Sequence, residues 1–146
     1  MDVAAAIGMA LALLVATVAI HYEVLSATFA GLPRLGVPPR LRILVAMAAI
    51  FGAHLAEITL YAVAFYGMER LQLGSIGGDF NGAWLDYFYF STTSYTTMGV
   101  GDVAPHGLLR LVAGLEGLNG FVLIGWSASF TYVTMEAYWR GDSPDR

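Results

Sequence analysis

Three long apolar stretches constrain this chain more than any other feature of its sequence. They cover residues 3–20, 43–66 and 108–135, and few ionisable side chains interrupt them. Each supplies the roughly 20 residues that a helix needs to cross a bilayer. The composition agrees, because 58% of the 146 residues are hydrophobic and 12% are charged, whereas soluble domains contain about 25% charged residues. The sequence therefore predicts an integral membrane protein whose partner is the lipid bilayer.

The first stretch is predicted to be a retained extra helix, residues 1–31, and not a cleaved signal peptide. It lacks a basic region in front, and its apolar part is longer than the roughly 7–15 residues of a signal peptide. The chain has no cysteine, which excludes disulfides and thiolate metal sites. It has no basic stripe either, so nucleic acid is not an expected partner.

The arginines between the first two stretches predict the orientation. Arg34, Arg40 and Arg42 lie in the segment 32–42, together with three prolines that keep either helix from continuing through it. Short arginine-rich loops remain cytoplasmic. The N-terminus is then outside and the tail 140–146 is cytoplasmic. A bacterial inner membrane is the location that suits this small architecture.

The segment between the second and third stretches carries the most specific pattern in the chain. Residues 83–95 are aromatic and compatible with a helix too short to cross, and residues 96–102 follow with the sequence TTMGVGD. A dehydrated cation needs oxygens in place of its water, and backbone carbonyls that line a path can supply them. Glycines at alternate positions, Gly99 and Gly101, permit the dihedral angles that turn successive carbonyls to one side. Thr97 can add its hydroxyl.

This run resembles the filter of the potassium-channel pore family, specifically of its two-helix pore module. The family filter reads Thr-Val-Gly-Tyr-Gly-Asp, and the Tyr-Phe-Ser at 89–91 and Pro105 also fit the family pattern. The resemblance implies an all-α membrane protein: three transmembrane helices, with a re-entrant pore helix and selectivity-filter loop between the second and third. The implied pore module is 43–139, with an outer helix 43–67, a pore helix 83–95, a filter 96–102 and an inner helix 107–138.

The resemblance also implies passive conduction of monovalent cations, preferably potassium, by a homotetramer in which each loop supplies a quarter of every oxygen ring. No covalent chemistry is involved, so neither enzyme activity nor a cofactor other than the permeant potassium ion is expected. The residues implied to bind potassium are Thr97, Met98, Gly99 and Val100, and those implied to support the filter are Thr96, Gly101 and Asp102. Among several glycines of the inner helix, Gly117 and Gly120 are possible gating hinges.

Two residues depart from the family pattern. Val100 stands where the family usually has a tyrosine whose hydroxyl holds the filter against the pore helix. Met98 stands in place of valine or isoleucine and is more flexible. A weakly selective monovalent cation channel and a non-conducting adaptor subunit that retains the pore fold are therefore alternatives to a selective potassium channel.

Ionisable residues within the apolar stretches are costly in a membrane and indicate a function or an interhelical contact. His54 and Glu57 share a helix face in the second stretch, while His21 and Glu23 lie late in the first helix. These four residues are predicted to approach one another. Hydrogen bonding that fastens the first helix to the pore module is the favoured interpretation. A proton-sensing pair, a metal site and an intramembrane metalloenzyme are the alternatives.

Several other polar positions have open roles. Glu116 and Asn119 share a face of the third stretch and contact either the permeation path and filter or the pore helix. Asp102 concentrates cations, forms a hydrogen bond behind the filter, or caps the next helix. His106 is expected to be a solvated loop residue, and the glycines within 67–82 are expected to make the outer loop flexible.

Overall fold

The computed structural model describes residues 2–140 of the chain, with side chains for 3–137. The predicted cytoplasmic tail lies outside the described residues, apart from its first position. The elements in chain order are α1 (Asp2–Gly31), the 3-10 helix η1 (Leu32–Arg34), α2 (Pro39–Arg70), β1 (Gly74–Gly78), α3 (Trp84–Tyr95), β2 (Val103–Gly107) and α4 (Leu109–Arg140).

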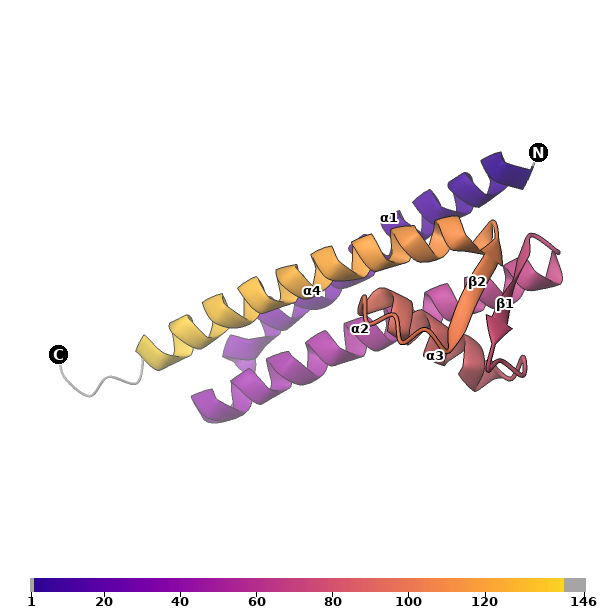
Figure 1. Ribbon diagram of the computed structural model, residues 1–146. Helices are drawn as coiled ribbons and strands as arrows, with labels where there is room; N and C mark the ends of the chain where they lie inside the picture. Colours follow the sequence, from indigo (N-terminus) through magenta and orange to yellow (C-terminus); the bar gives the residue numbers. More distant parts are fainter. Residues whose placement is uncertain (1, 141–146) are drawn as a thin grey trace.

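Three of these helices, α1, α2 and α4, are long and apolar enough to cross a membrane. They lie side by side, with α1 and α4 running in one direction and α2 in the opposite direction (Figure 1). Large apolar side chains are exposed along all three helices, a surface that suits lipid rather than water. The predicted all-α membrane protein with three transmembrane helices is confirmed.

α2 begins before the predicted outer helix. The sequence predicts an irregular segment over 32–42, whereas Pro39 already opens α2. Proline is tolerated at this position because the first residues of a helix need no N–H partner. Arg42 consequently lies in the first turns of α2, and its guanidinium donates to the carbonyls of Leu35 and Val37, at 3.1 Å each.

The antiparallel ribbon of β1 and β2 is not predicted by the sequence. Its register places Gly78 opposite Val103. Gly78 has a φ of 100°, and a Cβ on it would overlap the carbonyl oxygen of Asp102. The expectation of a flexible outer loop is therefore wrong for 74–78, because glycine there serves close approach of two backbones. The ribbon joins the segment before α3 to the segment after the predicted filter.

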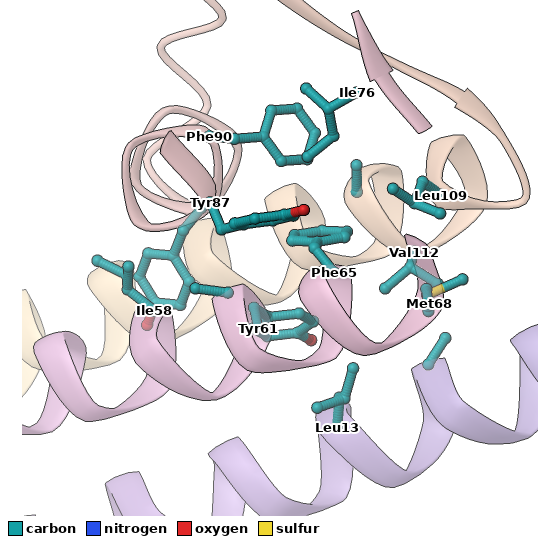
Figure 2. Close-up of a cluster of buried hydrophobic side chains, with 14 of the residues drawn as sticks. Leu13, Ile58, Tyr61, Phe65, Met68, Ile76, Tyr87, Phe90, Leu109 and Val112 are labelled. Atoms are coloured by element: carbon teal, nitrogen blue, oxygen red, sulfur yellow. The ribbon is translucent and has the colours of Figure 1, made fainter. Parts of the chain in front are cut away.

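The hydrophobic core lies where α3 and the ribbon meet the long helices (Figure 2). Phe65 of α2 and Phe90 of α3 pack edge to face, with ring centroids 4.9 Å apart. Such aromatic pairs add to the stabilisation from burial alone. The labelled members of the cluster are Leu13, Ile58, Tyr61, Phe65, Met68, Ile76, Tyr87, Phe90, Leu109 and Val112. The short helix α3 is thus packed against both α2 and α4.

α1 packs against α2 and α4 of its own chain. Ala6 and Ala10 on its inner face are fully or almost fully buried, with exposed fractions of 0% and 1%, and small residues let helices approach closely in membranes. Further along α1, Thr17 accepts a hydrogen bond of 2.7 Å from Nδ2 of Asn119 in α4. The extra helix is therefore part of the same packed unit as the other two.

Candidate functional site

α3 is fixed at both ends by hydrogen bonds that its sequence supplies. At its start, Oδ2 of Asp86 accepts from the backbone N–H groups of Asn81 and Ala83, at 2.9 and 3.1 Å. At its end, the hydroxyl of Thr96 donates to the carbonyl of Thr92 at 2.7 Å. The predicted filter therefore begins at a well-defined end of α3.

In the predicted filter, the backbone N–H groups and the backbone carbonyl groups differ in their hydrogen bonding. The N–H of Thr97 donates to Ser94 O at 3.0 Å, and the N–H groups of Met98 and Gly99 both donate to Thr93 O, at 2.9 and 3.2 Å. Within residues 2–140, no hydrogen bond reaches the carbonyl oxygens of 97–100. The amides thus fold back onto α3 while the carbonyls keep their capacity to bind.

The dihedral angles alternate along the same segment. φ is positive at Thr97 (56°), Gly99 (52°) and Gly101 (90°), and negative at the two residues between them. In an ordinary strand successive carbonyls point to opposite sides, and reversing the sign of φ at every second residue removes that alternation. The two glycines adopt this conformation readily. A β-branched threonine in the left-handed region is a genuine outlier, and the sequence does not predict it.

Residues 97–102 are exposed in the single chain. The side chains of Met98 and Val100 retain 67% and 55% of their accessible area. Apolar side chains left open beside unpaired carbonyls form a surface that other protein can cover.

Asp102 is held behind this segment by α3. Its Oδ2 accepts from the hydroxyl of Tyr89 at 2.7 Å, and its Oδ1 accepts from the N–H of Val103 at 3.0 Å. The hydrogen bond with the Asp102 carboxylate raises the pKa of Tyr89. Tyr89 therefore supplies a hydroxyl link between α3 and the end of the filter, although Val100 carries no hydroxyl. Among the three predicted roles of Asp102, this geometry favours the hydrogen bond behind the filter.

Two glycines of α4 allow the filter-bearing segment to approach closely. A Cβ on Gly117 would lie 3.2 Å from Ser94 O, and one on Gly120 would overlap Tyr95 O. In contrast, Gly114 and Gly125 would carry a Cβ in open space. α4 continues as one helix through all four positions. Gly117 and Gly120, predicted as possible hinges, thus have a packing reason to be glycine.

Three of the four predicted membrane polar residues come together. Nδ1 of His21 lies 2.9 Å from Oε1 of Glu57, and Nδ1 of His54 lies 3.2 Å from Oε2 of the same carboxyl group. His21 and Glu57 are completely buried. Glu23 does not join them, because it lies on the exposed side of α1. The predicted four-residue cluster is corrected to three on this point.

Two further members of this cluster, Tyr95 and Ser127, are not predicted by the sequence. The Tyr95 hydroxyl donates to Oε2 of Glu57 and lies 2.8 Å from Nδ1 of His54. Ser127 Oγ in α4 lies 2.9 Å from Nε2 of His54 and 3.1 Å from Nε2 of His21. The available signal was a serine within an apolar helix, since such residues commonly form interhelical hydrogen bonds.

Glu116 contacts the predicted pore helix and not the exposed filter. Ser91 Oγ lies 2.5 Å from Oε1 of Glu116 and 2.8 Å from the carbonyl oxygen of Ile58. The Ser91 hydroxyl thus links Glu116 of α4 to α3 and to the backbone of α2.

Residues 53–137 match the model of a family described as an ion channel. The matched region contains most of α2, all of α3, the filter segment and α4 up to Ala137. No curated protein and no solved structure matches the chain. The match confirms the resemblance that the filter sequence predicts. The chain therefore belongs to the ion-channel family built on the two-helix pore module, the family of potassium channels.

Proposed function

We propose that this channel conducts potassium ions passively through a pore lined by the backbone of 97–100. The observation that supports the proposal is the difference in hydrogen bonding between the amides and the carbonyls of the filter backbone. Its amides are bound to α3, and its carbonyls accept no hydrogen bond within the described part of the chain. Such oxygens can replace the hydration shell of a cation. The expected ligands are the carbonyls of Thr97, Met98, Gly99 and Val100, with the Thr97 hydroxyl in addition.

The proposal includes a homotetramer. One filter strand offers a single carbonyl at each level, and potassium filters use four such strands around the ion path. The exposed Met98 and Val100 side chains are the surfaces that neighbouring copies would cover. α3 points its C-terminus toward the filter, so its negative dipole end favours a cation there. Supporting roles for Thr96, Gly101 and Asp102 belong to this proposal.

A bacterial inner membrane with the N-terminus outside is the proposed setting. The N-terminus and the β1–β2 ribbon lie at one end of the helices, and the α1–α2 connection lies at the other (Figure 1). That connection carries Arg34, Arg40 and Arg42. Basic residues favour the cytoplasmic side, so the filter end faces outward.

A weakly selective cation channel is the second candidate. The observation that favours it is Val100, which is 55% exposed and has no hydroxyl to restrain the filter. The Tyr89–Asp102 contact compensates for that loss, and we therefore place potassium selectivity first.

Ion flux from liposomes tests the proposal. Purified protein should release potassium from loaded vesicles, and Gly99→Ala should reduce the flux about tenfold or more, because a Cβ at φ 52° strains the filter backbone. Gly8→Ala is the matched control, since a Cβ there meets open space on α1. Undiminished flux from the Gly99 variant would remove the filter from the conduction path.

A further inference from the structure

Five side chains from the four helices close a hydrogen-bonded ring inside the membrane-spanning part of the chain. Going around it, His21 Nδ1 meets Glu57 Oε1 at 2.9 Å, and Glu57 Oε2 meets the Tyr95 hydroxyl. The Tyr95 hydroxyl meets His54 Nδ1 at 2.8 Å, His54 Nε2 meets Ser127 Oγ at 2.9 Å, and Ser127 Oγ returns to His21 Nε2 at 3.1 Å. The contact of 3.2 Å between His54 Nδ1 and Glu57 Oε2 crosses the ring.

The five contacts of the ring determine how many shared hydrogens it needs. Each of its five contacts needs one hydrogen between the two heavy atoms. Tyr95 and Ser127 bring one each, and two neutral imidazoles bring one each, which makes four. The fifth must sit on the carboxyl group of Glu57 or on the second nitrogen of one histidine. In both arrangements the ring has no net charge, and neutrality is favourable for a group buried in a membrane.

The position of Tyr95 connects this ring to the filter. Tyr95 is the last residue of α3 and precedes the filter segment directly. Its carbonyl packs against Gly120, and its aromatic ring packs edge to face on His54 at 5.7 Å. The neighbouring carbonyls of Thr93 and Ser94 hold the filter amides. A displacement of Tyr95 is therefore transmitted to the start of the filter.

We propose that His21, Glu57, His54 and Ser127 are positioning residues for ion conduction, acting through Tyr95, and that they hold the filter only while the ring contains its fifth proton. The inference rests on the proposed conduction through 97–100. Loss of the fifth proton at high pH leaves two acceptors facing each other across one contact, and the end of α3 then loosens. Conduction is consequently expected to fall as the pH rises.

Other titratable groups near the ring have partners of their own. Tyr61 of α2 accepts from Asn119 at 3.3 Å, and Glu116 of α4 is bound to Ser91. Among the described side chains, the titratable groups of α1 and α3 that form hydrogen bonds in the ring are its own members, His21 and Tyr95. One side of the ring borders a pocket of about 700 Å³, lined by His54, Tyr95 and Ser127 among apolar residues.

Substitutions at Glu57 separate positioning from mere packing. The amide of Glu57→Gln can donate to Tyr95 and accept from His21, so all five contacts persist without an ionisable carboxyl group. We expect the wild-type potassium flux to fall with rising pH, whereas Glu57→Gln should keep its flux within about twofold over the same range. Glu57→Ala should lose about tenfold in flux at every pH, which is the scale of one buried hydrogen bond. Glu23→Gln, on the exposed side of α1, is the matched control. An alkaline fall in Glu57→Gln equal to that of the wild type would overturn the proposal.

A count of protons without any flux measurement distinguishes failure of the ring from failure of the proposed function. Nitrogen NMR of histidine-labelled protein reports which ring nitrogens carry hydrogen, and His106→Ala assigns the exposed third histidine. Infrared difference spectra against Glu57→Gln report whether the carboxyl group is protonated. One doubly protonated histidine, or a protonated Glu57 with two neutral histidines, supports the ring even where flux is absent. Two neutral histidines beside an ionised Glu57 would refute it.

Discussion

At the scale of residues, the surroundings of Glu116 favour one protonation state over the other. Glu116 has one oxygen bound to Ser91 and a second oxygen, Oε2, that is buried with no partner among the described residues. An ionised carboxylate with an orphaned oxygen would be very costly in a membrane. A protonated carboxyl group leaves only a weak carbonyl acceptor unpaired. We therefore expect Glu116 to be protonated where it meets Ser91 of α3.

Substitutions of Glu116 test this assignment. Glu116→Gln should change the free energy of unfolding by about 1 kcal/mol or less, because the amide also donates to Ser91. Glu116→Ala should destabilise by about 2–4 kcal/mol, through the lost hydrogen bond and the cavity it leaves. Unfolding in detergent followed by circular dichroism measures both. A large stabilisation by glutamine would show instead that the native carboxyl group is ionised.

At the scale of elements, the contact between α3 and α4 positions the start of the proposed filter segment. Gly120 gives the Tyr95 carbonyl its space, and Gly117 does the same for Ser94. The ribbon of β1 and β2 holds the other end, since the N–H of Asp79 donates to the carbonyl of Asp102 at 2.9 Å. The predicted filter is therefore held just before its first residue, at Tyr95, and at its last residue, Asp102.

Alanine at Gly120 should disturb this contact. A Cβ there would overlap a backbone oxygen that has no freedom to rotate away, so the potassium flux should fall about tenfold or more and stability should drop by about 1–3 kcal/mol. Gly125→Ala meets open space in the same helix and should retain flux, with unchanged or slightly higher stability. Equal behaviour of the two variants would contradict the packing role and return Gly120 to the set of hinge candidates.

At the scale of the whole molecule, the three membrane helices and the place of the filter segment are predictable from the sequence. The length and low charge of the apolar stretches predict the helices, and the spacing of Gly99 and Gly101 predicts the place of the filter segment. The ribbon was missed because its pairing depends on residues far apart in the chain, where glycine has a packing use that composition does not reveal. Tyr95 and Ser127 were missed for the same reason, since only the packing of α3 and α4 brings them to the histidines. The positive φ of Thr97 depends on the amides that α3 binds.

The extra helix also acquires a role at this scale. α1 contributes His21 to the ring and Thr17 to Asn119, so it is linked by polar contacts to both α2 and α4. In a bilayer such contacts are modest individually, but the ring joins four helices at the level where α3 ends. The first helix, residues 1–31, is in this way connected to the filter segment. It packs as one unit with the pore module.

The reversal potential of the protein in a planar bilayer, with potassium on one side and sodium on the other, tests the central claim most directly. Filter carbonyls that replace potassium's hydration shell should move the reversal potential far toward the potassium equilibrium value, with potassium at least about tenfold more permeant than sodium. A reversal potential near zero would assign the chain to weakly selective channels. The absence of any current, or a current carried by anions, would contradict conduction through the carbonyls of 97–100.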